Sequence, residues 1–115
     1  MRFRFTKADR LRKRSEFLRL ANRGKKIQDQ YFIAVYSQRR IQRNRLGVTV
    51  ARKVGNAPTR NRIKRLSREF FRLNRQTITG YWDINIIAKK QAANLPYEQA
   101  FLSLKDILDN ISRGL

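Results

Sequence analysis

Apolar residues recur at spacings of three and four in three segments of the chain, and they predict a helix in each: residues 13–23, 58–75 and 96–111. Gly24 follows the first segment and is typical of the position just past a helix end. The second segment has one apolar face and one face that is almost purely cationic. The third segment has the most regular stripe, and its members are expected in the core: Tyr97, Phe101, Leu104, Leu108 and Ile111.

Three other segments have the composition of β-strands. Residues 27–37 contain an aromatic and β-branched run, residues 46–50 alternate with a period of two, and residues 81–88 place apolar side chains on one side. A polar loop separates the first two strands, which are therefore expected to pair antiparallel. The element order predicts an α+β two-layer sandwich, with a small, mostly antiparallel sheet and two helices on one face. The short first helix should leave part of the other face open as a groove for single-stranded nucleic acid.

Length indicates one domain over residues 1–115, and charge indicates that this domain binds a polyanion. The chain carries 28 Lys and Arg against 8 Asp and Glu, which gives a net charge of +20 and calls for a polyanionic partner. The basic residues crowd into residues 1–26 and 39–75, whereas residues 91–115 are close to neutral. This layout suggests one binding side and one structural side. Nucleic acid is the first candidate partner and an anionic membrane the second, although no helix-turn-helix pattern favours DNA.

The composition argues against a self-sufficient enzyme. The chain has no Cys and no His, so it lacks the usual thiolate nucleophile, the commonest general base and the commonest zinc ligands. Its eight acidic residues are scattered, and no phosphate-binding loop is present. We therefore expect no catalytic residue, no metal site and no cofactor bound by the protein itself. No apolar run is long enough to span a bilayer, and the basic N-terminus lacks the apolar region of a signal peptide, so a cytoplasmic location is expected.

The densest candidate for binding chemistry runs from Ala51 to Arg65. Asn56 suits the cap of the second helix and Pro58 its first turn, so free backbone N–H groups are expected where a phosphate could dock. Arginine adds planar, bidentate forks for phosphate oxygens. Asn61 lies between two arginines; it can contact a phosphate, a base edge or a hydrated cation, or it can be no more than a solvated or capping amide.

This stretch also carries a resemblance. Gly55-Asn56-Ala57 followed by Arg60-Asn61-Arg62-Ile63-Lys64-Arg65 resembles the signature of the bacterial ribonuclease P protein component family. Further similarities cover nearly the whole chain: Arg10-Leu11 with Glu16-Phe17, Arg45-Leu46-Gly47 with Val48 and Val50, Asp83-Ile84 with Ile86-Ile87-Ala88, and Leu95 with Tyr97-Glu98.

The resemblance implies a function in tRNA maturation. Proteins of this family join a catalytic RNA, which performs the metal-dependent hydrolysis with Mg²⁺, and help it to remove the 5′ leader from precursor tRNA. The resemblance also implies two strands within residues 24–37, and hence three strands before the signature helix. The strand–helix–strand crossover around that helix should be left-handed, against the general rule.

The resemblance also assigns site residues. The positions implied to face the catalytic RNA are Arg52, Lys53, Asn56, Arg60, Asn61, Arg62, Lys64, Arg65 and Arg68. Those implied to line a cleft for the leader are Phe17, Ile33 and Val35, which leaves Phe32, Ala34 and Tyr36 for the core. Phe17 has an alternative role in ordinary core packing. Ala21 departs from the pattern, because some relatives carry an aromatic residue there.

One other class of protein fits the same basic helix. A ribosomal protein or general RNA chaperone needs no leader cleft, and it would not distinguish precursor from mature tRNA.

Overall fold

The computed structural model describes residues 6–40 and 42–113. Three helices and four strands make up the fold: α1 (Arg14–Arg23), β1 (Lys25–Gln28), β2 (Phe32–Gln38), β3 (Arg45–Thr49), α2 (Ala57–Asn74), β4 (Trp82–Ala88) and α3 (Tyr97–Arg113). Four short 3₁₀ turns lie between them: η1 (Lys7–Asp9), η2 (Arg52–Val54), η3 (Arg75–Thr77) and η4 (Lys90–Ala92). The predicted helices and strands are confirmed, except that the single strand expected over residues 27–37 is two strands, as the family resemblance implies.

The strands form one sheet in the order β1-β2-β4-β3, with β4 in the interior. β2 pairs antiparallel with β4, and β3 pairs parallel with β4. The antiparallel pair predicted between residues 27–37 and 46–50 is therefore wrong. β4 separates them because this apolar strand, with Ile84 and Ile86 buried, has hydrogen-bonding partners along both of its edges.

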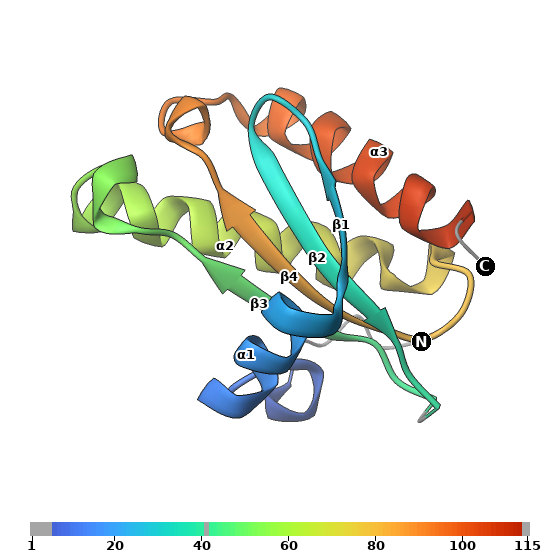
Figure 1. Cartoon of the computed structure of the whole chain (residues 1–115). Coiled ribbons are helices and arrows are strands. Elements are labelled where there is room, and N and C mark those ends of the chain that lie inside the picture. The colour runs from blue at the N-terminus through green and yellow to red at the C-terminus, as the bar shows by residue number, and fades with distance from the viewer. Residues whose placement is uncertain (1–5, 41, 114–115) are drawn as a thin grey trace.

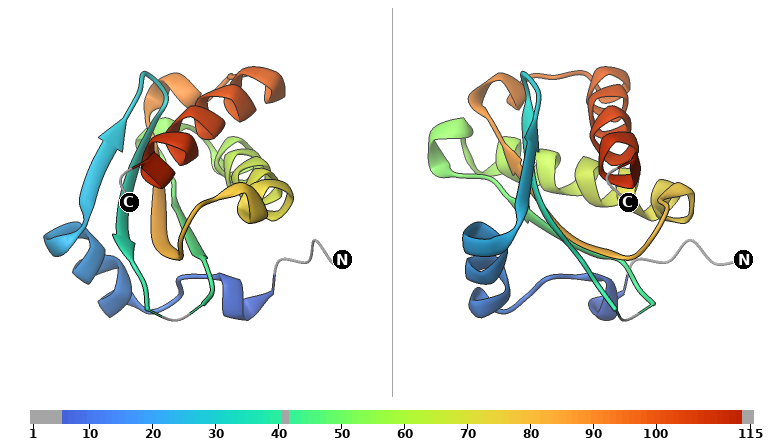
Figure 2. Two further views of the ribbon diagram at one scale, coloured as in Figure 1. Left: turned by 90° about the vertical axis from the view of Figure 1, so that its right-hand side faces the viewer. Right: turned by 45° about the vertical axis from the view of Figure 1, so that its right-hand side comes forward.

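The helices α2 and α3 cover one face of the sheet, and α1 lies on the other (Figures 1 and 2). The parallel pair β3 and β4 is joined through α2. In Figure 1, α2 passes behind the sheet, and β4 is on the right of β3 when both strands are turned to point upward. This arrangement makes the crossover left-handed, as the resemblance implies and against the usual preference.

The main core fills the space between the sheet and the helices α2 and α3. Phe32, Ala34 and Tyr36 of β2 face this core, which confirms the side of the strand assigned to them. The stripe of α3 is buried only in part, since Tyr97 is 48% exposed and Phe101 half-buried. The apolar residues of α2 are buried up to Phe71, whereas the following Leu73 is exposed.

A second, smaller apolar cluster lies between α1 and the opposite face of the sheet. Leu11, Leu20 and Val35 are buried there, and the half-buried residues Phe17, Ile33 and Ile87 pack against them. A Cβ atom on Gly47 would lie 2.5 Å from Cε1 of Phe17, so glycine lets the ring rest directly on β3. In the described part of the chain, no helix combines the length and the apolar character that a membrane span requires.

Candidate nucleic-acid interface

The start of α2 satisfies most of its own backbone groups. The Asn56 side chain accepts a hydrogen bond from the Thr59 N–H at 3.0 Å, and the Arg60 N–H bonds to the Asn56 carbonyl. Pro58 has no N–H, so of the donors expected here the N–H groups of Asn56 and Ala57 are left. Anion binding at this end of the helix therefore depends on side-chain charge more than on backbone N–H groups. The Arg60 guanidinium donates to the Gly55 carbonyl at 2.9 Å, which anchors part of that charge.

The signature residues do not all point to solvent. Arg52, Lys53, Asn61 and Arg65 are exposed, as is Asn56, whereas Arg60, Arg62, Lys64 and Arg68 are half-buried. Among the hydrogen bonds of the described residues, none involves the Asn61 side chain, so its amide is available to a ligand. Together, these residues form a cationic surface along η2 and α2, which we call the arginine face.

Part of the arginine face is concave. Arg65, Arg68, Glu69 and Arg72 line a depression of about 610 Å³, together with Arg10 from the N-terminal segment. Burial, and then the positive charge of Arg10, lower the pKa of Arg68 below its ordinary value. Such like charges lie close together most readily where an anion neutralises them. Arg10 is not among the binding residues predicted from the sequence, although the basic density of residues 1–26 was its signal.

Arg62 has a structural role that its place in the signature does not reveal. Its guanidinium donates to the Leu95 carbonyl at 2.7 Å and lies 5.7 Å from the centre of the Tyr97 ring. These contacts connect the middle of α2 to the start of α3. Arg62 therefore has fewer donors left for RNA than Arg65, one helical turn along.

The sheet face beside α1 is the second candidate surface. Phe17 and Ile33 are half-buried, so each keeps part of its side chain accessible. Val35 is only 6% exposed beneath α1, which leaves little of it for a ligand. Next to these residues, Ile87 is half-buried and Thr49 is exposed. Alternation along residues 81–88 was the available signal for Ile87, since its side chain faces away from Ile84 and Ile86.

Polar contacts fix the same face. The Thr49 hydroxyl donates to Oδ1 of the buried Asn85 at 3.1 Å. At the other end, the Arg45 guanidinium donates two parallel hydrogen bonds of 2.9 Å to Asp83 and a third to Glu16 of α1. The hydrogen bonds that Arg45 donates to Asp83, more than any other contact, raise the pKa of Arg45. This cluster joins α1 to both β3 and β4 and thereby sets the edge of the open sheet face.

The pKa of Glu16 shows how firmly it is bound. Burial acts to raise it, but hydrogen bonds from the backbone N–H groups of Lys13 and Arg12, and then the Arg45 guanidinium, lower it overall. Glu16 therefore both caps the first turn of α1 and ties that helix to the sheet. In the described residues, no three His, Cys, Asp or Glu side chains come close enough to hold a metal ion.

Known proteins match this chain along most of its length. A family model described as Ribonuclease P matches residues 5–112. The chain belongs to the ribonuclease P protein family. A ribonuclease P protein component from Desulfatibacillum aliphaticivorans is 48% identical, over 97% of this chain and 95% of its own. One from Thermotoga maritima is 36% identical, over 96% and 95%.

Solved structures of the family agree with the fold. The RNase P protein of Thermotoga maritima superposes with a TM-score of 0.82 at 33% identity, covering 88% of this chain and 96% of its own. The RNase P protein of Staphylococcus aureus gives a TM-score of 0.84 at 32% identity, over 91% and 96%. The resemblance drawn from the signature is thus confirmed, and with it a role in tRNA processing as part of a ribonucleoprotein.

Proposed function

We propose that this protein is the non-catalytic subunit of ribonuclease P, which assists a catalytic RNA in cleaving the 5′ leader from precursor tRNA. The observation that carries the proposal is the arginine face on α2, in a chain that a ribonuclease P family model matches over residues 5–112. A surface of this charge fits a folded RNA, because neutralising phosphates releases counterions. In this proposal, RNase P RNA binds the arginine face.

The hydrolysis itself belongs to the RNA in this proposal. The chain has no Cys and no His, and the acids of its described part do not gather into a metal site. The Mg²⁺ ions of the reaction would accordingly be bound by RNA, and no cofactor is bound by the protein itself. Precursor tRNA is processed in the cytoplasm of bacteria, which is where the proposal places the protein, with neither DNA nor membrane as a partner.

The 5′ leader is assigned to the sheet face beside α1. Phe17, Ile33 and Ile87 offer half-buried apolar surface there, and the exposed Lys26 of β1 adds positive charge beside it. Unpaired bases bind to surfaces of this kind by stacking and apolar contact, while the backbone phosphates stay near basic side chains. Ala21 is exposed on α1, so this chain has less to stack on than relatives with an aromatic residue there.

The test is cleavage of a leader-bearing precursor tRNA at low magnesium with buffer, protein alone, RNase P RNA alone, or both. Activity only with both present is expected, because the protein adds positive charge where leader and RNA repel each other. Activity with protein alone would contradict the assignment of catalysis to RNA. Tight RNA binding without stimulation, or equal binding of precursor and mature tRNA, would instead indicate a general RNA chaperone.

A further inference from the structure

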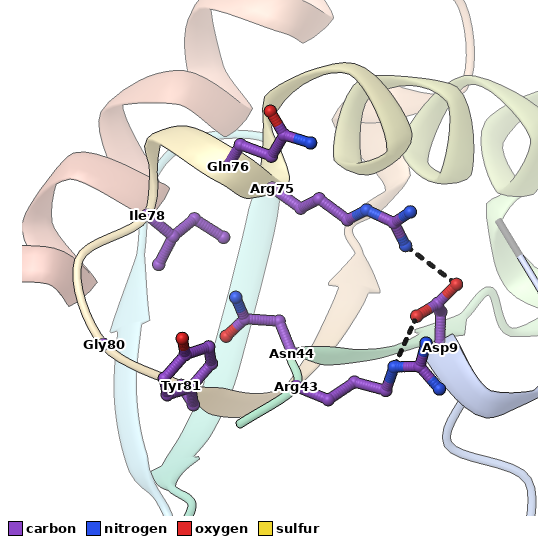
Figure 3. Close-up of a pocket in the computed structure, with 8 residues that line it drawn as sticks. All are labelled: Asp9, Arg43, Asn44, Arg75, Gln76, Ile78, Gly80 and Tyr81. Carbon is purple, nitrogen blue, oxygen red and sulfur yellow. Dashed lines mark ion pairs between the residues drawn. The ribbon is translucent and has the colours of Figure 1, made fainter. Parts of the chain in front are cut away.

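A polar pocket lies at the end of the molecule opposite the start of α2. It has a volume of about 410 Å³, and its walls come from η1, the segment before β3, η3 and the turn before β4 (Figure 3). The 18 residues of α2 separate this pocket from the start of the arginine face by about 27 Å, at 1.5 Å per residue. Neither the arginine face nor the sheet face beside α1 includes it.

The pocket is organised around a buried carboxylate. Asp9 is 2% exposed and accepts hydrogen bonds from the backbone N–H and the hydroxyl of Thr6, at 2.8 and 3.1 Å. It also binds Arg75 NH1 at 2.7 Å and Arg43 Nε at 3.4 Å. Burial acts to raise the pKa of Asp9, but these hydrogen bonds and the charge of Arg75 lower it overall. One carboxylate therefore orients two guanidinium groups, and the trio keeps a net positive charge.

Arg43 lines the pocket with a side chain that is about half exposed. It contacts Asp9 through Nε, and its side chain is 51% exposed. Figure 3 shows Arg43 and Arg75 approaching Asp9 from two elements, so that both line the same wall. Two oriented guanidinium groups beside an open cavity suit the oxygens of a phosphate.

The opposite wall suits a nucleobase. Tyr81 is 41% exposed, and its backbone carbonyl accepts a hydrogen bond from the Arg39 N–H at 2.7 Å, which fixes the turn. Oδ1 of Asn44 accepts from the Trp82 N–H at 2.7 Å, so its Nδ2 points into the cavity (Figure 3). Figure 3 shows the Gln76 side chain across the cavity from Tyr81, next to Arg75. An aromatic ring with an amide group beside it can stack on a base and bond to its edge.

We infer that this pocket binds one unpaired nucleotide of an RNA strand, with the phosphate at Arg43 and Arg75 and the base against Tyr81. The choice of RNA as the polymer rests on the proposed function. The pocket itself recognises a phosphate joined to a base, whether in a strand or as a free nucleotide. It gives the protein a third contact with RNA, which shares no lining residue with the arginine face but lies beyond the end of that face marked by Arg10 and Arg72.

The pocket can be tested without any catalytic assay, by NMR titration of the whole chain with adenosine 5′-monophosphate, uridine 5′-monophosphate or inorganic phosphate. The nucleotides should shift the amide signals of Asn44, Gly80 and Tyr81, and phosphate alone should bind more weakly. Tyr81→Ala should weaken nucleotide binding roughly 10-fold, whereas Tyr81→Phe should retain it because the ring still stacks. Arg43→Ala should weaken nucleotide and phosphate binding alike, and Arg113→Ala, which removes an exposed charge on α3, should change neither.

Two results would overturn the inference: no shift of these signals by either nucleotide, or inorganic phosphate binding as well as the nucleotides do. Because this titration involves no precursor tRNA, its failure would leave the proposed function standing. If the cleavage assay failed and the titration succeeded, the pocket would still bind a nucleotide, and only the proposed function would be contradicted.

A crosslinking experiment identifies the strand. The chain has no cysteine, so Gln76→Cys provides a single thiol for a photoreactive group at the pocket wall. In the assembled holoenzyme, a crosslink to RNase P RNA or to precursor tRNA would support the inference and name the source. A crosslink to neither RNA would overturn it, as would equal crosslinking from Asn110→Cys on the exposed side of α3.

Discussion

Gly47 is the residue on which the position of α1 depends most directly. An added Cβ would lie 2.5 and 2.8 Å from two carbons of the Phe17 ring, which is closer than real contacts allow. Gly47→Ala should therefore displace Phe17 and lower the free energy of unfolding by about 1–3 kcal/mol, the usual cost of overpacking. Urea unfolding followed by circular dichroism measures this change.

A second variant, Phe17→Leu, tests whether contact with the Phe17 ring causes this loss of stability. A smaller side chain in Phe17→Leu should relieve the clash, so the double variant should lose less stability than the sum of the two single variants. Additive losses would mean that the ring and the glycine act independently.

Arg62 and Arg65 form a matched pair of signature residues with different expected roles. Arg62→Ala removes the hydrogen bond to the Leu95 carbonyl and the contact with Tyr97, so it should lower the free energy of unfolding by about 1–2 kcal/mol. The exposed Arg65→Ala should change that free energy by less than about 0.5 kcal/mol. Thermal unfolding of the two variants decides the difference.

Affinity for RNase P RNA should separate the same pair. Arg65→Ala should weaken binding and reduce the steepness of its salt dependence by about 0.7–0.9 in log–log slope, the share of one phosphate contact. Equal slopes for Arg65→Ala and the unmodified protein would contradict a phosphate contact at this position.

At the scale of elements, α1 is attached to the sheet by a contact that depends on pH. Folding lowers the pKa of Glu16 below its ordinary value of 4.5, so its charged form stabilises the fold. That stabilisation is complete above the ordinary value and is lost as the pH falls through the lowered one. We expect the NMR signals of Phe17 and Leu20 to move in this acid range, as α1 loosens before the core between the sheet and α3.

Glu16→Gln is the control for this prediction. It keeps the shape of the side chain but cannot carry the charge, so α1 should already be loosened at neutral pH and its acid transition should disappear. Asp9, whose pKa is also lowered, keeps its own acid transition in this variant. An unchanged transition at Phe17 would show that Glu16 does not hold the helix.

The helices and strands were predictable from the sequence, but the pairing of the strands in the sheet was not. Periodicity located all three helices and the last two strands, because side-chain spacing is a local property. The order β1-β2-β4-β3 was not predictable, since β4 lies between β2 and β3, the two strands that were expected to pair with each other. The family resemblance, rather than any local pattern, supplied the extra strand and the handedness of the crossover.

The candidate site was also predictable only in part. Charge density identified the arginine face, but it did not show that Arg62 is engaged by Leu95 and Tyr97, or that Arg10 joins Arg68. The pocket around Asp9 had no signal at all in the sequence. Its walls come from four segments that only the folded chain brings together.

For the whole molecule, the net charge of +20 opposes folding of the free protein. With a radius of gyration of 13.1 Å, its charges repel each other across the whole fold when salt is low. Raising the salt from about 0.01 to 0.1 M shortens the screening length from about 30 to 10 Å. The midpoint of thermal unfolding should therefore rise over this range.

Affinity for RNase P RNA should fall over the same range of salt, because screening weakens the attraction to phosphates. Screening of the same net charge should therefore raise the midpoint of unfolding and weaken the binding of RNA. A midpoint that does not rise would mean that ion pairs such as Arg45 with Asp83 already offset the repulsion.

The interior position of β4 also sets the order of events during synthesis. β2 and β3 emerge from the ribosome before β4. β2 can already pair with β1, but the ladders that join β2 and β3 to β4 must wait for residues 82–88. Until then a growing chain of about eighty residues exposes unpaired strand edges and the basic α2 in the midst of ribosomal RNA. A chain that stops before Trp82 would lack the strand between β2 and β3, so the sheet can be completed only near the end of translation.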